Sequence, residues 1–409
     1  MRNHVKSSML HFSSIILFRN YKYSLYKLTR YSHSGLSGNL LSRRKISYIS
    51  EKLNENILNN SKQNLLNKDV KFISENIIKL IASYGSPDVL PLANYYFNAK
   101  GKSIRPAIIC MIARASNILF KETTSPTNKT YIDSNQLKIA CFAEMIHTAS
   151  LLHDDVVDRA NTRRGNISAN IKWGQRKPVL VGNLIMALAS QELAKIKNVQ
   201  IINILSIILM DLIHGELMQM GSKLTDNERF SHYLQKTFKK AGSLLANSCK
   251  CVALLSLENK EYRNNESVDR KLNLFYKFGK HIGMAFQIRD DILDFTGDMD
   301  KTGKNCGNKD IAISGLANAP LLFACEKFPY IEAIIMRRFS EPGDVEKALE
   351  AIKKSDGLKD TQNLVLFHAG HAKNILDELF LPLSKTDFDL LNLYNSLISM
   401  CDYIVTRDC

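Results

Sequence analysis

Two groups of three aspartates share one spacing and are the residues of this sequence best suited to chemistry. They are Asp154, Asp155 and Asp158, and Asp290, Asp291 and Asp294, and we call them the first and second acidic triplets. Residues four apart lie on one face of a helix, so each triplet gathers carboxylates that repel one another. Apolar residues flank both triplets, and burying unpaired carboxylates is costly. A hard divalent cation such as Mg²⁺ would offset that cost, and the alternative is a solvated acidic helix face.

Basic residues next to glycine or proline indicate which ligand such a metal would share. Lys102 follows a glycine, Arg105 precedes a proline, and Arg163 and Arg164 precede Gly165. An arginine fork matches phosphate oxygens, a lysine supplies a point charge, and Mg²⁺ commonly shares its shell with substrate phosphates. The sequence contains neither a Walker A loop nor a dinucleotide-binding glycine loop. We therefore expect an apolar substrate that carries a diphosphate.

Helical periodicity surrounds these residues and predicts the elements that position them. Apolar residues recur at steps of three and four along most of the chain after Ser47. The expected helices cover residues 106–120, 136–158, 178–194, 201–220, 234–257, 268–295, 316–328, 345–353, 361–379 and 387–405. No stretch shows the alternation of a strand. We predict an all-α single domain over residues 46–409, with ten or more helices around a central cavity.

The N-terminal segment differs in composition from the rest of the chain. Residues 1–45 are basic and rich in Ser and Tyr, and the first acidic residue of the chain is Glu51. A basic, acid-free N-terminus is typical of a mitochondrial transit peptide, and it predicts a mitochondrial location. A disordered basic tail and a secretory signal over residues 9–18 are the alternatives, although His11 and two serines interrupt that apolar run.

Composition limits the other functions expected of the chain. The net charge is +15, but nine basic residues precede Glu51, so the remainder carries +6 and no nucleic-acid partner is expected. The eight cysteines have no metal-finger spacing and are expected to be reduced thiols. The sequence has no run of 18 apolar residues, so we expect no spanning helix.

The two triplets, the Gly101–Pro106 stretch and the arginine pair together resemble the trans-isoprenyl diphosphate synthases, also called polyprenyl synthases. The resemblance runs from about Asn94 to the C-terminus and is nearest to the mitochondrial long-chain solanesyl and decaprenyl type. Further matching stretches are Glu144–Gly165, Gly215–Gln219, Tyr233–Thr237, Phe286–Asp291 and Pro320–Ala324, while Met336–Phe339 and Val405–Asp408 fit the long-chain subgroup. The resemblance implies an isoprenoid-synthase-type bundle and a prenyltransferase that adds isopentenyl diphosphate head-to-tail to an allylic diphosphate of the farnesyl or geranylgeranyl type.

The same resemblance implies a role for each candidate residue. About three Mg²⁺ ions are expected, two on Asp154, Asp155 and Asp158 and another on Asp290, Asp291 and Asp294. The residues expected to bind isopentenyl diphosphate are Lys102, Arg105, His147 and Arg164. Those expected around the allylic diphosphate are Arg163, Lys236 and Lys304, with Gln287 and Thr237 beside the reacting carbons. The catalytic group would be the first triplet with Lys236, Asp290 and Asp291.

Small residues before the first triplet predict a long product. Ala149 and Ser150 occupy positions where short-chain enzymes of this family tend to carry an aromatic residue that closes the pocket. Met145 and Phe142 lie one and two turns deeper on the same side of the helix, and they are either tunnel walls or ordinary core. By analogy with the family, the product is expected to be about C35 to C50 and to become the ubiquinone side chain.

Two stretches depart from the family pattern. Gly182–Asn183 stands where Gly–Asp is more usual, and the loop 303–315 is longer than expected, which puts a site role for Asp310 in doubt. Other readings stay open. A terpene cyclase or head-to-head synthase would not need the isopentenyl site of Lys102, Arg105 and Arg164. A non-catalytic subunit of a hetero-oligomeric synthase would be expected to have lost triplet acids, and a shorter-chain geranylgeranyl synthase is a further alternative.

The resemblance also implies partners beyond the two substrates. The family usually forms homodimers, so a homodimer is expected, with a hetero-oligomer containing a second subunit as the alternative. An apolar product of this length would leave the enzyme through peripheral association with a membrane.

Overall fold

The computed structural model describes residues 58–84, 87–97, 103–120, 131–163, 166–220, 226–257, 265–296, 318–384 and 387–408. The helices are α3 (Leu58–Ser83), α4 (Leu90–Phe97), α5 (Ile104–Phe120), α6 (Ser134–Val157), α7 (Ala169–Trp173), α8 (Arg176–Ala194), α9 (Val199–Met220), α10 (Asp226–Thr237), the π-helix η1 (Phe238–Gly242), α11 (Ser243–Leu255), α12 (Glu266–Thr296), α15 (Ala319–Lys327), α16 (Ile331–Met336), α17 (Asp344–Lys354), α18 (Gly357–Ser384) and α19 (Phe388–Thr406). Within these ranges the strands are limited to one antiparallel hairpin, β1 (Thr162–Arg163) with β2 (Asn166–Ile167). The all-α prediction is confirmed.

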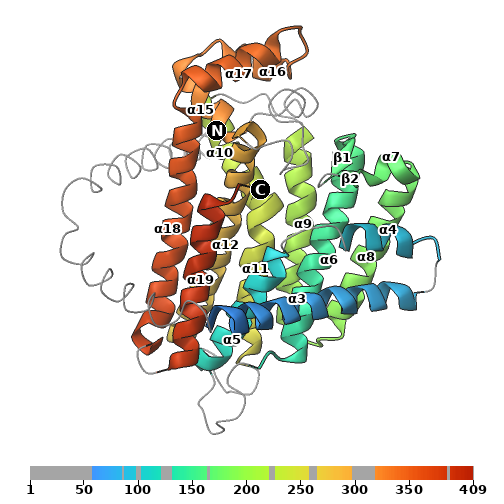
Figure 1. The fold of residues 1–409 in the computed structure, drawn as a ribbon, viewed down its shortest axis with the longest axis vertical. Helices are drawn as coiled ribbons and strands as arrows, with labels where there is room; N and C mark the ends of the chain where they lie inside the picture. Colours follow the sequence, from blue (N-terminus) through green and yellow to red (C-terminus); the bar gives the residue numbers. More distant parts are fainter. Residues whose placement is uncertain are drawn as a thin grey trace, which may run out of the picture.

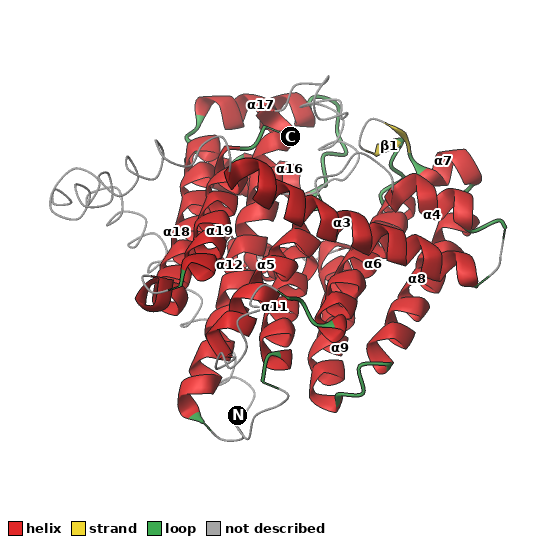
Figure 2. Ribbon diagram, turned by 60° about the horizontal axis from the view of Figure 1, so that its bottom comes forward, coloured by secondary structure: helices red, strands yellow, loops and turns green. Residues whose placement is uncertain are grey.

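Most of the long helices run lengthwise and side by side, while α3 crosses them at one face (Figures 1 and 2). The helix predicted over 234–257 begins earlier and has three parts, because α10, η1 and α11 follow one another without a break from Asp226 to Leu255. The sequence pattern did not reveal the π turn in its middle. A π turn inserts a residue into a helix and often marks a functional site.

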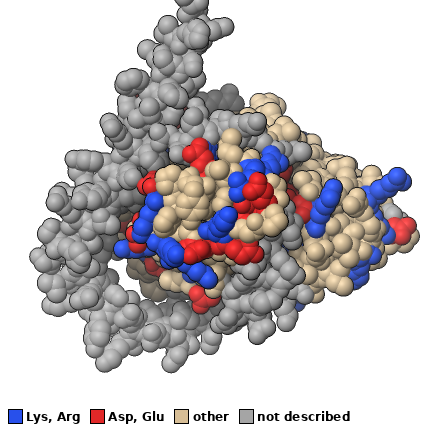
Figure 3. Space-filling view, turned by 90° about the horizontal axis from the view of Figure 1, so that it is seen from above, with Lys and Arg blue, Asp and Glu red and all other residues tan. Residues whose placement is uncertain are grey.

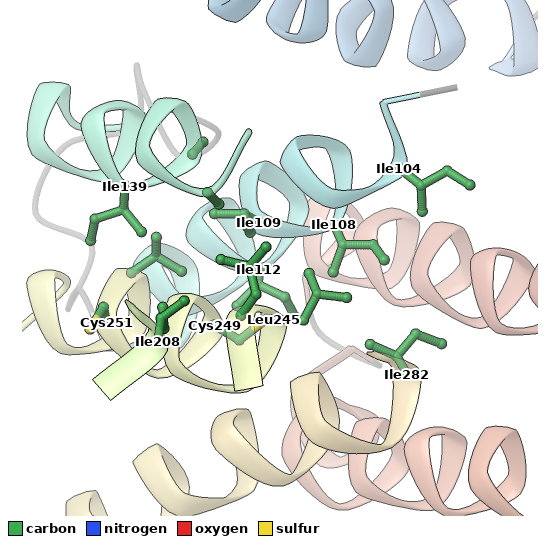
Figure 4. Close-up of a cluster of buried hydrophobic side chains, with 14 of the residues drawn as sticks. Ile104, Ile108, Ile109, Ile112, Ile139, Ile208, Leu245, Cys249, Cys251 and Ile282 are labelled. Atoms are coloured by element: carbon green, nitrogen blue, oxygen red, sulfur yellow. The ribbon is translucent and has the colours of Figure 1, made fainter. Parts of the chain in front are cut away.

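The core lies where α5, α6, α11 and α12 meet. Figure 4 shows isoleucines of α5 against Ile139 of α6, Leu245 and Cys249 of α11, and Ile282 of α12. Nearly every residue of α5 is buried, so this helix is apolar on all sides and runs through the interior. A rigid core of this kind holds α6 and α12, the two helices that carry the acidic triplets.

The helix α6 is fixed at its start by a capping box. The Asp133 side chain accepts a hydrogen bond from the backbone N–H of Asn135 at 2.8 Å, and Gln136 Oε1 accepts one from the backbone N–H of Asp133 at 3.0 Å. Both bonds satisfy backbone donors that a helix N-terminus leaves unpaired. The helix then continues for 24 residues to the first triplet.

A smaller apolar cluster joins α15, α16 and α17 at one end of the molecule. It contains Leu321, Ile331, Ile334 and Ile352. Arg229 of α10 forms an ion pair with Glu332 of α16, which ties this end to α10. Figure 3 looks onto this end and shows Lys and Arg next to Asp and Glu across the described surface.

The helix α9 has an unusual surface for an outer helix. By length and composition alone, its Val199–Gln219 segment is long and apolar enough to cross a membrane. Of its most apolar stretch, 33% is buried inside the protein. Met210, Ile213 and Leu217 are all at least 60% exposed. The surface of α9 is therefore a candidate interface.

The close crossing of α11 and α12 gives a test of the fold. A Cβ atom added at Gly279 would lie 2.4 Å from the carbonyl oxygen of Leu245, so the backbones must separate to admit it. We expect Gly279→Ala to cost about 3 kcal/mol, measured by chemical denaturation. The matched control is Gly370→Ala on α18, where a Cβ meets nothing within 4 Å and helix propensity should raise stability slightly. Equal stability of the two variants would contradict the described crossing.

Candidate active site

The two acidic triplets lie at the carboxyl ends of two helices. Asp154 and Asp155 belong to the last turn of α6, and Asp158 is its C-cap residue, whose backbone N–H donates to the Asp154 carbonyl at 2.8 Å. The second triplet occupies the last two turns of α12, which ends at Thr296. The negative end of a helix dipole disfavours carboxylates, so both triplets require cations nearby.

In the first triplet, the middle carboxylate is fully buried and held on both oxygens. Arg163 Nε donates to Asp155 Oδ1 at 2.7 Å, and its Nη2 contacts the same oxygen. The hydroxyl of Tyr96 donates to Oδ2, and the backbone N–H of Ala169 donates to the Tyr96 oxygen at 3.3 Å. These contacts direct Asp155 toward protein partners, so its predicted metal role remains a prediction.

The outer acids of the first triplet lie partly buried in an acidic environment. Burial raises the pKa of Asp154 to about 7, Lys240 opposes that rise, and Glu216 and Asp158 add to it. Burial also raises the pKa of Asp158, against Lys240. A neighbouring cation would stabilise the ionised form of both carboxylates, and they are therefore suited to a metal.

In the second triplet, the middle carboxylate is again the buried one. Tyr233 donates a hydrogen bond of 2.7 Å to Asp291 Oδ2, which also accepts from the backbone N–H of Ala319 at 3.3 Å. Gln287 Nε2 lies 3.5 Å from Oδ1 of the same side chain. Burial raises the pKa of Asp291 to about 6, while the bond from Tyr233 lowers it. The structure thus brings Gln287 to the second triplet, and Asp294 lies in the next turn of α12, partly buried.

A lysine of α10 and a lysine of η1 each lie near one of the two triplets. Burial lowers the pKa of Lys236, while Asp291 of the second triplet and Glu216 raise it. Lys240 forms an ion pair with Glu216 and donates to Gln219 Oε1 at 2.9 Å, and its charge reaches Asp154 and Asp158. One helical segment therefore supplies a cation to each triplet. Thr237, at the end of α10, is buried and hydrogen-bonds Tyr233.

The position of Lys240 depends on a glycine in α9. A Cβ atom added at Gly215 would lie 2.7 Å from Cγ of Lys240 and 3.3 Å from Cβ of Lys239. Lys239 reaches Asp211 of the same helix at 2.6 Å. The π turn η1 thus presents two successive lysines to α9, and Gly215 leaves room for them.

Two of the four predicted isopentenyl diphosphate residues, Arg105 and His147, lie next to each other, and Arg105 also lies over an aromatic ring. Arg105 Nη1 lies 2.9 Å from Nε2 of His147, and its guanidinium lies 5.2 Å from the centre of the Phe286 ring. Arg407 also stacks on that ring, at 3.9 Å, and forms an ion pair with Asp290. Arg105 and His147 are therefore brought together beside the second triplet.

The C-terminus is fixed at this place by α12. Arg289 donates two hydrogen bonds, of 3.0 and 2.8 Å, to the carbonyl oxygen of Arg407. Arg407 Nη2 in turn donates to the Phe286 carbonyl at 3.0 Å. The end of the chain thus adds a buried cation to the second triplet.

The predicted chain-length residues lie on the part of α6 that leads into the core. Ala149, Met145 and Phe142 are buried, and the hydroxyl of Ser150 donates to the His147 carbonyl at 2.9 Å. Their role in product length remains a prediction. Lys102, Arg164, Lys304 and Asp310 lie outside the described residues.

Several residues of the site were missed by the sequence analysis. They are Tyr96, Glu216, Tyr233, Lys240, Phe286 and Arg407. All but Tyr96 and Lys240 fall in stretches that resemble the family. The resemblance could have drawn attention to these residues, but it assigned no role to them. Tyr96 and Lys240 carried no such signal.

The described residues include no group of three acidic, histidine or cysteine side chains close enough to hold a metal alone. Mg²⁺ is usually bound by one or two carboxylates together with substrate phosphates. An ion at either triplet would therefore need phosphate or water oxygens to complete its set of ligands.

A helical bundle that carries an acidic triplet at the carboxyl ends of two helices, with a lysine near each triplet, is the arrangement of an isoprenoid-type prenyltransferase. The chain belongs to the polyprenyl synthetase family, whose sequence profile matches residues 87–352. It is 41% identical over 341 residues to the human all trans-polyprenyl-diphosphate synthase, covering 83% of this chain and 76% of the relative. It is 35% identical over 327 residues to the mitochondrial solanesyl-diphosphate synthase 1 of Oryza sativa subsp. japonica, covering 78% and 73%.

A solved structure supports the same assignment. The polyprenyl synthase of Caulobacter crescentus, crystallised with calcium and isoprenyl diphosphate, matches with a TM-score of 0.69 and 27% identity. The match covers 85% of this chain and 97% of that one.

Removing the C-terminal cation tests the described geometry. Arg407→Ala would remove the ion pair between Arg407 and Asp290 and uncover Phe286, so we expect a loss of about 2 kcal/mol in stability without added metal. The matched control is Lys373→Ala, which removes the more exposed ion pair of Lys373 with Asp402 on α19 and should cost less than about 1 kcal/mol. Thermal denaturation of both variants is the measurement, and an equal loss in the two would count against the buried position of Arg407.

Proposed function

We propose that this chain is a mitochondrial long-chain all-trans-polyprenyl diphosphate synthase. It adds isopentenyl diphosphate repeatedly to an allylic diphosphate of the farnesyl or geranylgeranyl type, and its product becomes the side chain of ubiquinone. The observation that carries the proposal is the pair of acidic triplets at the carboxyl ends of α6 and α12, with Lys240 near the first and Lys236 near the second. The names of the human and rice relatives support the reaction, and the rice name supports the location.

The donor set of the site fits Mg²⁺. The outer acids, Asp154 and Asp158 on α6 and Asp290 and Asp294 on α12, are carboxylates near a set of basic side chains, and about three ions would be held there with diphosphate oxygens. When bound, the ions supply Lewis-acid charge to the diphosphate. The calcium and isoprenyl diphosphate of the Caulobacter enzyme are consistent with this arrangement.

Different residues of the chain would then bind the two diphosphates. Lys236 and Arg163, with Lys304, neutralise the allylic diphosphate, so that its carbon–oxygen bond breaks to leave an allylic cation. Arg105 and His147, with Lys102 and Arg164, hold isopentenyl diphosphate so that its double bond faces that cation.

Bond formation completes the reaction without a covalent enzyme intermediate. The terminal alkene carbon of isopentenyl diphosphate bonds to the first carbon of the allylic cation. The positive charge then lies on the methyl-bearing carbon of the former double bond. The CH₂ group between that carbon and the diphosphate-bearing carbon loses a proton to the departed diphosphate, which forms a new double bond and gives an allylic diphosphate five carbons longer. Gln287 and Thr237 line the reacting carbons, and the buried surroundings exclude water that would trap the cation.

Residues 1–45 would direct the chain to the mitochondrion, and residues 46–409 would form the synthase domain. The basic, acid-free composition of the first segment supports the former. The family match over 87–352 supports the latter.

The direct test is an assay of the purified chain with Mg²⁺, farnesyl diphosphate and labelled isopentenyl diphosphate. We expect products of about C35 to C50 by mass spectrometry, and none from Asp154→Asn. A chain that is folded but gives no elongated product alone would favour a partner-dependent subunit. Products that stop at C20 would favour the geranylgeranyl alternative.

The small side chains before the first triplet give a second prediction. A phenylalanine at position 149 would fill the buried side of α6 one turn before Asp154 and block growth of the chain. We expect Ala149→Phe to shorten the product by several isoprene units, while Ala149→Ser, the matched control, leaves its length unchanged. An unchanged product length in Ala149→Phe would contradict the prediction that Ala149 lines the tunnel for the growing chain.

We also propose that α9 forms the centre of a homodimer interface. Its apolar residues Val199, Met210, Ile213 and Leu217 are 72%, 62%, 63% and 60% exposed. Met210, Ile213 and Leu217 follow one another at steps of three and four, which suit packing of one helix against another. A two-fold axis would bring this stripe against its own copy.

A charge introduced into α9 tests that interface. Met210→Asp should convert a dimer into a monomer in sedimentation measurements, because it buries an unpaired carboxylate in the interface. Leu366→Asp on α18, where the leucine is 49% exposed, is the matched control and should stay dimeric. A wild-type monomer that floats with vesicles would instead favour a membrane-facing α9. A wild-type monomer that gains a partner subunit would favour the hetero-oligomer.

A further inference from the structure

The two triplets share a feature that their sequences do not reveal. In each, the middle acid is the buried one, with exposed fractions of 0% for Asp155 and 7% for Asp291. In each, a buried tyrosine from a different helix donates a hydrogen bond to that acid. The tyrosines are Tyr96 of α4 and Tyr233 of α10, 59 and 58 positions away from their partners.

Each middle carboxylate is also held by a second donor. Asp155 accepts two contacts from Arg163, and Asp291 accepts from the backbone N–H of Ala319. A carboxylate has about four lone-pair positions, and these donors occupy most of the accessible ones. Turning either carboxylate toward a metal would break buried hydrogen bonds, which is costly.

The tyrosines are suited to hold these acids permanently. Burial, followed by the bond to Asp155, raises the pKa of Tyr96 far above its ordinary value. Burial and the charge of Asp291 do the same for Tyr233. Both hydroxyls therefore keep their protons and remain donors.

The outer acids are placed differently. Asp154, Asp158 and Asp294 are only partly buried, and the Asp290 side chain is 35% exposed, although its Oδ1 contacts Arg407. Because the middle acid of each triplet is fixed, the helix backbone fixes the directions of the acids on either side of it. The division of roles is thus built into the fold of each helix end.

We propose that Tyr96 and Tyr233 are positioning residues that anchor the middle acid of each triplet and thereby orient the outer acids toward the metals. Asp155 and Asp291 act as buried anchors, and Asp154, Asp158, Asp290 and Asp294 act as the ligands. This inference rests on the proposed function, since it assigns roles within the metal and diphosphate site. It departs from the sequence expectation, which counted all six acids among the metal ligands.

The test removes one hydroxyl at a time. Tyr96→Phe and Tyr233→Phe keep the rings and their packing, and the probe is Mn²⁺ in the presence of inorganic diphosphate, followed by electron paramagnetic resonance. We expect Mn²⁺ affinity to fall about tenfold in each variant, as is common when a residue that orients a metal ligand is lost. The Mg²⁺ concentration for half-maximal rate should rise by the same factor, with KM for isopentenyl diphosphate nearly unchanged.

Two other tyrosines provide matched controls. Tyr95, next to Tyr96, donates to the Ile167 carbonyl at 2.8 Å, and Tyr394 donates to Asp377 at 2.6 Å on the distant α18–α19 pair. Tyr95→Phe and Tyr394→Phe should lose some thermal stability and keep wild-type Mn²⁺ affinity. All four variants are compared by thermal denaturation, so that lost stability and lost metal affinity are separated.

The outcomes distinguish this inference from the proposed function. Unchanged Mn²⁺ affinity in a folded Tyr96→Phe or Tyr233→Phe variant would overturn the positioning role, even if stability fell. If one variant does not fold, the other decides the question. Failure of the wild-type chain to bind Mn²⁺ with diphosphate would remove the proposed function, and this inference with it.

Discussion

The site depends on the neutralisation of carboxylates that lie at the negative ends of two helices. The dipoles of α6 and α12 oppose the ionised acids, and partial burial raises the pKa of Asp154 and Asp291. Basic side chains from three other places offset this repulsion: Arg163 from the hairpin, Lys236 and Lys240 from α10 and η1, and Arg407 from the C-terminus. Metal ions and a diphosphate would extend the same alternation of charge, which is why the two ligands are expected to bind together.

The segment from α10 through η1 interacts with both triplets, through a hydrogen bond and through the charges of its lysines. Tyr233 holds Asp291, Lys236 lies near the same acid, and Lys240 reaches Glu216 and the first triplet. Gly215 allows α9 to approach the π turn closely enough for this contact. A shift of this one segment would therefore disturb both halves of the site.

The sequence predicted the fold well and placed both triplets on helices, because helical periodicity and aspartate spacing are local patterns. Helical periodicity located α5, α6, α9 and α12 within a few residues, and the spacing of the aspartates indicated their shared face. The π turn was missed because the chain stays helical on both sides of it, so the stretch was predicted as one helix. The partners of the middle acids were missed because Tyr96 lies 59 positions from Asp155, and such pairings arise only when the helices pack. The C-terminal Arg407 was matched to the long-chain subgroup but given no role, since nothing local links it to Asp290, 117 positions away.

We propose that the two triplets together bind metal ions and one diphosphate, and that their outer acids are the metal ligands. The most direct measurement is a crystal structure of the chain with Mn²⁺ and inorganic diphosphate, in which anomalous scattering locates the metal ions. We expect Mn²⁺ on Asp154 and Asp158 and on Asp290, bridged by diphosphate. Asp155 and Asp291 should still be hydrogen-bonded to Tyr96 and Tyr233. Metal bound through Asp155 or Asp291, or metal confined to one triplet, would contradict this proposal.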